Sequence, residues 1–98
     1  MLIKIHKSYR DVVAICDTEL LGKKFEQGRL QLDLTGEFFN GEEKTEDEIL
    51  EIVKNADRED ATFNIIGSQS VQLALKAGII DKKGIKKIQG IPTALTLL

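Results

Sequence analysis

Alternating apolar and polar residues mark the first part of the chain. Within Met1 to Lys7, apolar and polar residues alternate from Ile3 to His6, which is typical of a strand with one buried face. A second apolar stretch follows, so the pattern predicts strands over residues 1–8 and 11–17, joined by a tight turn at Tyr9–Arg10. If that turn has two residues, Ile3 lies opposite Cys16 and His6 lies opposite Val13.

The stretch after this hairpin predicts a short helix and then a third strand. Asp17 or Thr18 can cap the helix, and Gly28 can end it. Its apolar positions are Leu20, Leu21 and Phe25. Leucines then alternate with polar residues over 30–35, which predicts the strand, and residues 36–44 follow as a loop or short extended piece.

The second half of the chain predicts two helices around a buried strand. Thr45 and Glu48 form a capping box, and an apolar stripe over residues 49–56 predicts the helix that follows. Residues 61–66 are a short apolar run suited to a central strand. The second helix begins after Gly67, with Ser68 or Ser70 as its cap, and ends at Gly78.

The last residues predict two extended segments. Ile85, Ile88 and Ile91 line the first segment, and residues 93–98 form the last strand, which Pro92 precedes because proline cannot donate to a ladder. Helices interleaved with short strands predict an α+β fold: a two-layer α/β sandwich in which helices pack on one face of a mixed β-sheet. Residues 1–98 are expected to form a single compact domain.

Composition narrows the class of protein. The chain is 42% hydrophobic and 31% charged, the balance of an ordinary globular domain. The single cysteine, Cys16, excludes an internal disulfide and fits a reducing compartment. Neither a secretory signal nor an apolar run of membrane-spanning length occurs, so a cytoplasmic location without a membrane partner is expected.

Charge is unevenly distributed along the chain. Residues 42–60 contain nine acidic and three basic side chains, for a net charge of −6, and the other residues carry a net charge of +4. Such polarity steers binding partners. The acidic stretch Glu42–Glu51 is therefore a candidate surface for a basic protein partner.

The junction between the central strand and the second helix is a candidate anion site. Its residues are Gly67, Ser68, Gln69 and Ser70. Backbone amides at a helix start are unpaired, and they lie at the positive end of the helix dipole, so a phosphate or carboxylate suits them. The junction lacks the lysine and further glycines of a nucleotide-binding loop, and no nucleotide or other cofactor is expected.

A lysine-rich segment follows the second helix. Its cations are Lys82, Lys83, Lys86 and Lys87, which can contact RNA phosphates. Arg10, Lys4 and Lys7 are further candidates if the hairpin lies nearby. Tyr9, Phe38 and Phe39 can either stack on unpaired bases or fill the core.

Residues for catalysis or metal binding are few. In the two-residue-turn register His6 and Cys16 point to opposite faces of the hairpin, whereas a three-residue turn would place them on one face. A lone histidine without a second ligand at metal spacing predicts no metal site. A carboxylate pair among Asp17, Asp33 and Glu37 is the remaining option, and no catalytic residues are expected.

Several segments together resemble a known family. They are 7–17, 19–26, 32–34, 38–39, 41–42, 64–67, 71–78 and 90–92. In these segments the chain is similar to the small archaeal proteins grouped as domain of unknown function family 424. The resemblance implies an archaeal source, a compact two-layer α/β fold and a contextual association with the translation apparatus. It implies no activity or catalytic residue.

Three functions remain open from the sequence. The leading hypothesis is a non-catalytic module that binds RNA or a ribonucleoprotein, in translation. The alternative is a protein-interaction module that uses the acidic Glu42–Glu51 surface or an exposed sheet edge. The third is an enzyme or binder for a small anionic metabolite at the Gly67–Ser68 helix start, with Asp17 or Asp33 as base.

Overall fold

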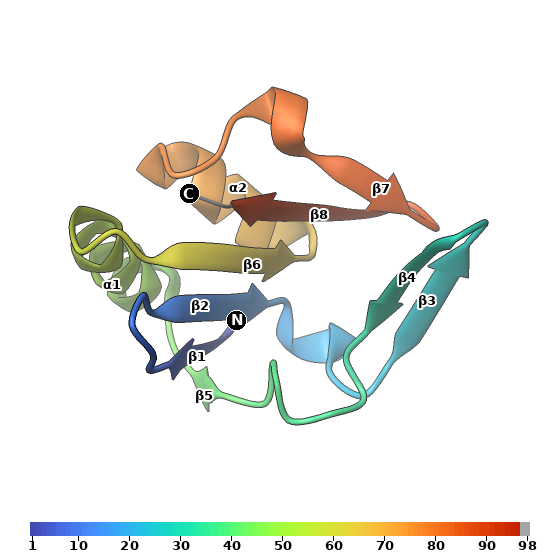
Figure 1. The fold of residues 1–98 in the computed structure, drawn as a ribbon. Coiled ribbons are helices and arrows are strands. Elements are labelled where there is room, and N and C mark those ends of the chain that lie inside the picture. The colour runs from blue at the N-terminus through green and yellow to red at the C-terminus, as the bar shows by residue number, and fades with distance from the viewer. Residues whose placement is uncertain (97–98) are drawn as a thin grey trace.

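A six-stranded mixed sheet spans the molecule, with a two-stranded sheet beside it (Figure 1). The computed structural model describes residues 1–96. The strands of the large sheet, in spatial order, are β5 (Glu42–Glu43), β1 (Leu2–His6), β2 (Val12–Cys16), β6 (Thr62–Ile66), β8 (Ile91–Thr96) and β7 (Lys86–Ile88). Only β2 and β6 run parallel among these neighbours. The small sheet pairs β3 (Lys24–Gln27) with β4 (Leu30–Asp33).

Both α-helices pack on one face of the large sheet, which confirms the predicted two-layer α/β architecture. They are α1 (Glu46–Arg58) and α2 (Ser68–Ala77), and Figure 1 shows them on the same side. Ile15, Phe63 and Ile65 of the central strands pack there with Ile49 and Val53 of α1. This layer is the larger of the two cores.

A second core lies on the opposite face of the sheet. Alternate residues of the central strands, such as Cys16 and Ile66, point to this side and meet Leu32, Leu34 and Phe39. The β3–β4 hairpin and the loop before β5 therefore cover one end of the face that the helices leave bare.

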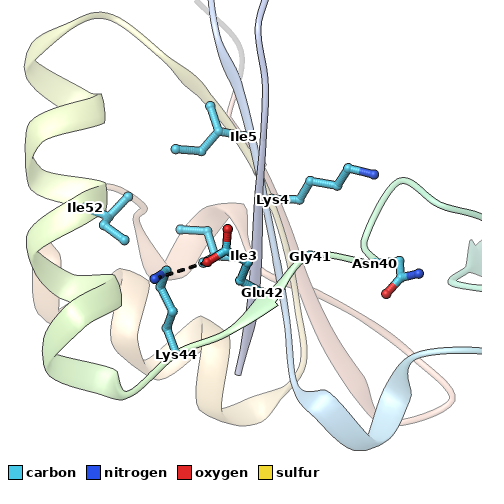
Figure 2. Close-up of a pocket in the computed structure, with 8 residues that line it drawn as sticks. All are labelled: Ile3, Lys4, Ile5, Asn40, Gly41, Glu42, Lys44 and Ile52. Carbon is cyan, nitrogen blue, oxygen red and sulfur yellow. Dashed lines mark ion pairs between the residues drawn. The ribbon is translucent and has the colours of Figure 1, made fainter.

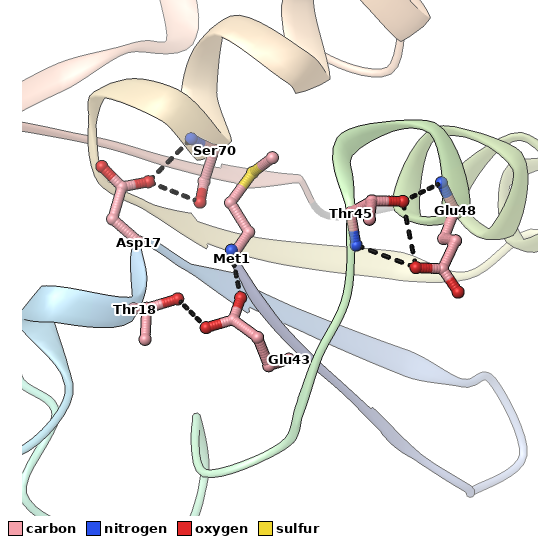
Figure 3. Close-up of polar contacts among 7 residues, drawn as sticks. All are labelled: Met1, Asp17, Thr18, Glu43, Thr45, Glu48 and Ser70. Carbon is pink, nitrogen blue, oxygen red and sulfur yellow. Dashed lines mark hydrogen bonds and ion pairs between the residues drawn. The ribbon is translucent and has the colours of Figure 1, made fainter.

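The start of α1 confirms the predicted capping box. The Thr45 hydroxyl accepts from the Glu48 amide at 3.2 Å, and the Glu48 carboxylate accepts from the Thr45 amide at 3.0 Å (Figure 3). Gly78, in a left-handed conformation with φ of 74°, ends α2 as predicted.

The helix predicted around Phe25 is wrong. Only a 3₁₀ turn, η1 (Thr18–Leu20), forms there, and Phe25 lies in β3, paired with Leu32. Gly22 takes a positive φ and donates to the Leu34 carbonyl, so the chain becomes extended directly after η1. Gly28, expected to end a helix, instead supplies the positive φ at the first position of a two-residue hairpin turn.

The tail differs from its prediction in two details. Of Ile85, Ile88 and Ile91, expected to line one extended segment, only Ile88 lies in β7 (Lys86–Ile88); Ile85 precedes that strand and Ile91 begins β8. Pro92 is the second residue of β8 and not its predecessor; it faces Lys87, and its carbonyl accepts from the Gly67 amide at 2.9 Å. A short 3₁₀ turn, η2 (Lys82–Gly84), precedes β7. The predicted last strand extended to residue 98, and residues 97 and 98 lie outside the described part. No helix within residues 1–96 has the length and apolarity needed to cross a bilayer.

Candidate functional site

The start of α2 is occupied by a carboxylate of the chain itself. One oxygen of Asp17 accepts from the Gln69 amide at 3.1 Å. The other accepts from the amide and the hydroxyl of Ser70, both at 2.8 Å (Figure 3). Asp17 and Ser70 are 4% and 0% exposed. The expectation of unpaired amides at Gln69 and Ser70 is therefore wrong.

Sheet topology explains how Asp17 reaches α2. Since β2 and β6 are parallel neighbours, their carboxyl ends lie at the same edge, and Asp17 follows β2 where Gly67 follows β6. Gly67 has a φ of 113°, and a Cβ on it would lie 2.3 Å from the Asp17 carboxyl carbon. Gly67 is also the N-cap residue, so Ser68 and Ser70 lie inside the helix and neither caps it, contrary to prediction. Asp17 likewise makes no side-chain cap to η1.

Ser68 remains on the surface beside a lysine of the tail. Ser68, Gln72, Lys87 and Gly90 line a shared hollow of about 250 Å³. Within residues 1–96 no hydrogen bond joins the Ser68 amide to another group. Binding of an external anion at Gly67–Ser70 stays a prediction, and the Asp17 carboxylate removes two of the donors on which it rested.

The four tail lysines lie along the β7 edge of the sheet. Lys82 and Lys83 belong to η2, and Lys86 and Lys87 belong to β7. All four are exposed, and no ion pair joins any of them to a carboxylate within the described chain. We call these four residues the lysine edge.

Arg10 lies far from the lysine edge. It belongs to the turn between β1 and β2, whereas β7 is four strands away from β1, or about 19 Å at the usual spacing. Lys4 and Lys7, on β1 and the same turn, are separated from the edge in the same way. The lysine edge and the β1–β2 turn are thus two separate cationic regions.

The aromatic residues divide between surface and core. Tyr9 is fully exposed in the β1–β2 turn, and Phe39 is 6% exposed in the core. The Phe38 ring is 41% exposed and stacks on His6, with ring centroids 4.4 Å apart. None of them lies in β7 or η2, so the structure does not place them on the lysine edge.

Sequence reasoning missed one cation near this edge. Arg29 is exposed in the turn of the β3–β4 hairpin. That hairpin is joined to the end of β7, because the Gln89 amide donates to the Gln27 side chain at 2.7 Å. The helix predicted over this region concealed the proximity; a hairpin reading of Gln27–Leu30 would have suggested it.

The acidic stretch lies at the opposite edge of the sheet. Glu42 and Glu43 form β5, and the first turn of α1 follows. Glu43 accepts from the Met1 ammonium group at 2.5 Å and from the Thr18 hydroxyl at 2.6 Å, and these bonds lower the pKa of its carboxyl (Figure 3). Glu42 and Glu43 thus lie at the β5 edge in ion pairs with Lys44 and with the Met1 ammonium group, whereas the lysine edge lies at β7.

His6 and Cys16 form no catalytic pair. The observed register pairs His6 with Val12 and Leu2 with Cys16, one residue away from the predicted register, so the two side chains share a face after all. They lie four residues apart along the hairpin, or about 13 Å. Burial, followed by the charge of Asp17, raises the pKa of the Cys16 thiol to about 11, which disfavours the reactive thiolate.

The candidate carboxylates have structural partners. The hydroxyl and the amide of Thr35 donate to Asp33 and lower the pKa of its carboxyl. The Glu37 side chain accepts from Asn40 at 3.0 Å. Residues 1–96 contain no group of three histidine, cysteine or acidic side chains placed to hold a metal ion.

Comparisons with known proteins identify a family and a solved structure whose functions are unknown. A family described as "Protein of unknown function (DUF424)" matches residues 6–97. The chain is similar to a solved structure titled as an uncharacterized conserved protein from Methanopyrus kandleri, with a TM-score of 0.86 and 23% identity over 97% of this chain and 88% of that one. No match is found among curated protein sequences. The structural likeness supports the fold.

Proposed function

Because the chain belongs to the DUF424 family, whose function is unknown, we propose a function from its charge geometry: it is a non-catalytic module that binds RNA through the lysine edge. The observation that carries the proposal is the exposure of Lys82, Lys83, Lys86 and Lys87 on one sheet edge, none of them neutralised by an ion pair within residues 1–96. When lysines without ion-pair partners contact RNA phosphates, the counterions condensed on the RNA are released, and this release favours binding.

The position of the acidic residues of β5 supports RNA binding through the lysine edge. β5, which contains Glu42 and Glu43, lies at the far edge of the sheet from β7, so phosphates that approach the lysine edge do not meet these two carboxylates. The charge separation would also align the molecule as it approaches RNA. Ser68 and Gln72, which share a hollow with Lys87, would supply neutral donors beside it.

Phosphate contacts of this kind orient a protein on a nucleic acid but do not by themselves distinguish one nucleotide sequence from another. The module would accordingly bind structured RNA or a ribonucleoprotein through the sugar-phosphate backbone of the RNA. Since the family resemblance implies an association with translation, ribosomal RNA is the first RNA to test.

A charge-matched pair of variants tests the proposal. The first replaces the lysine edge with alanine, and the control replaces Lys7, Lys23, Lys54 and Lys76, which are also exposed and lie elsewhere; of these, Lys7 and Lys76 are in ion pairs with Asp11 and Glu46. Both variants lose four positive charges. We expect a ribosomal RNA fragment to bind the wild type and the control with similar affinity and the first variant at least about tenfold more weakly. Equal losses in the two variants would reduce the effect to net charge and contradict the proposal.

A further inference from the structure

Strand β1 has an open edge on the side of β5. β5 pairs only with Leu2 and Ile3, whereas β1 continues to His6. The Lys44 amide donates to the Met1 carbonyl, so the main-chain groups of Met1 face this edge. In an antiparallel strand the main-chain amide and carbonyl groups of successive residues face alternate sides. The amide and carbonyl groups of Ile3 and Ile5 therefore face this edge as well. Within residues 1–96 no strand lies opposite Ile5 there.

Gly41 explains why β5 ends so early. A Cβ on Gly41 would lie 2.1 Å from the Ile3 carbonyl oxygen, so the chain passes β1 too closely to continue as an ordinary strand. The Gly41 amide donates to the Phe39 carbonyl at 2.9 Å and turns the chain away. Within residues 1–96 no strand therefore pairs with the β1 edge beyond Ile3.

An apolar hollow adjoins this open edge. Its volume is about 480 Å³, and Ile3, Ile5 and Ile52 of α1 form its apolar wall (Figure 2). Ile5 is 38% exposed although it lies in a sheet strand. Figure 2 shows Lys4 pointing away from Ile52, and Lys44 is held by Glu42 at 3.3 Å. An apolar side chain can therefore enter beside Ile5 without displacing a lysine.

The flank of α1 beside the hollow is acidic. Glu48 and Glu59 lie four residues before and seven residues after Ile52, positions on the same flank of a helix, and both are exposed. A segment that docks in the hollow thus has the carboxylates of Glu48 and Glu59 on either side of Ile52, and these favour a positively charged partner.

We propose that the β1 edge receives an extended, basic segment of a partner protein, added as a further strand beside Ile5. Main-chain hydrogen bonds to the Ile5 amide and carbonyl would hold the segment. Every second side chain of the segment would face the helices: an apolar one in the hollow against Ile5 and Ile52, and lysines or arginines on either side of it toward the α1 carboxylates. This interaction uses the edge of the sheet opposite to the lysine edge and is independent of RNA binding.

Two synthetic peptides probe this site. The first is Thr-Lys-Thr-Val-Thr-Lys-Thr, in which valine and both lysines share one face of an extended chain. The second carries glutamate in place of lysine. We expect the lysine peptide to bind at low salt and to slow hydrogen exchange of the Ile5 amide, while the Lys4 amide, which faces Ala14 of β2, exchanges unchanged. The glutamate peptide should bind at least about tenfold more weakly.

Variants locate the binding. Ile5→Lys places a charge on the open edge and should weaken the lysine peptide at least about tenfold. Leu95→Lys, at a residue 56% exposed in β8, makes the same change elsewhere and should leave binding intact, as should the alanine variant of the lysine edge. If Ile5→Lys fails to fold, the exchange of the wild-type Ile5 amide decides.

Any of three peptide-binding results would overturn the proposal: equal binding of the two peptides, unchanged exchange at Ile5 with saturating lysine peptide, or full binding by a folded Ile5→Lys protein. Dimerisation of the wild type that Ile5→Lys abolishes, seen by sedimentation, would also overturn it, because a second copy would then be the occupant. RNA binding by the lysine edge is measured separately, so either proposal can fail alone.

Discussion

The Asp17 carboxylate accepts two hydrogen bonds of 2.8 Å from Ser70, one from its amide and one from its hydroxyl, although 53 residues separate them in sequence. This contact joins the end of β2 to the start of α2 across the only parallel pair of strands in the described sheet. It satisfies donors that would otherwise be buried without partners. It also places an internal anion where the sequence suggested a free site.

Loss of this carboxylate should destabilise the protein substantially. Asp17→Ala removes the acceptor for three donors, of which the two of Ser70 are buried, so we expect the free energy of unfolding to fall by about 3 kcal/mol. Urea unfolding measures the change. A fall of less than about 1 kcal/mol would mean that water replaces the carboxylate without cost.

Gly67 should tolerate no side chain. Gly67→Ala combines a φ of 113° with a Cβ that collides with Asp17, and we expect a loss of about 3 kcal/mol in the same assay. Gly36→Ala is the control, because a Cβ there meets nothing within 4 Å and the backbone has no positive φ. Similar stability of the two variants would contradict the close approach of Asp17.

Local signals predicted the elements that depend on local chemistry. The Thr45–Glu48 capping box, the apolar run of β6 and the left-handed Gly78 each act within a few residues, and the structure confirms them. The helix predicted around Phe25 is wrong because contacts with residues distant in sequence override the local pattern. Its conformation is decided by pairing with Leu32 and by the Gly22–Leu34 hydrogen bond, neither of which appears in a helical pattern.

The candidate site depended on contacts between distant residues. Unpaired amides at Gln69 and Ser70 were a sound expectation for a helix start alone, but only the parallel pairing of β2 with β6 brings Asp17 to them. The predicted hairpin register was one residue out, because the observed turn is longer than two residues. The lysine edge, a continuous stretch of sequence, required no such information to be recognised.

The capping box of α1 should make the free energy of unfolding depend on pH in the acidic range. Hydrogen bonds from the Thr45 amide and hydroxyl lower the pKa of Glu48, so its contribution is present above the ordinary value of 4.5 and is lost as the pH falls through the lowered pKa. At neutral pH we expect Thr45→Ala to lower the free energy of unfolding by about 1 kcal/mol. Urea unfolding at decreasing pH should show this difference shrinking; a constant difference would contradict the coupling.

Cys16 should be inert in the native protein. Its pKa is raised from 9.0 to about 11, so the folded state holds the thiol proton more tightly than the unfolded state does. Its contribution to stability is complete below 9.0 and is lost as the pH rises toward about 11. We expect thiol reagents at about pH 8 to react only as fast as the protein opens, and wild-type stability to fall more steeply than that of Cys16→Ala above pH 9.0. Rapid labelling of the folded protein would contradict this.

The salt dependence of RNA binding tests the central claim most directly, namely that the lysine edge contacts phosphates. Affinity for a ribosomal RNA fragment is measured from about 50 to about 200 mM salt for the wild type, for the alanine variant of the lysine edge and for the charge-matched control. If all four lysines contact phosphates, the slope of log affinity against log salt should decrease in magnitude by about 3 in the lysine-edge variant and hardly at all in the control. The same slope in all three proteins, or binding by none of them, would contradict the account.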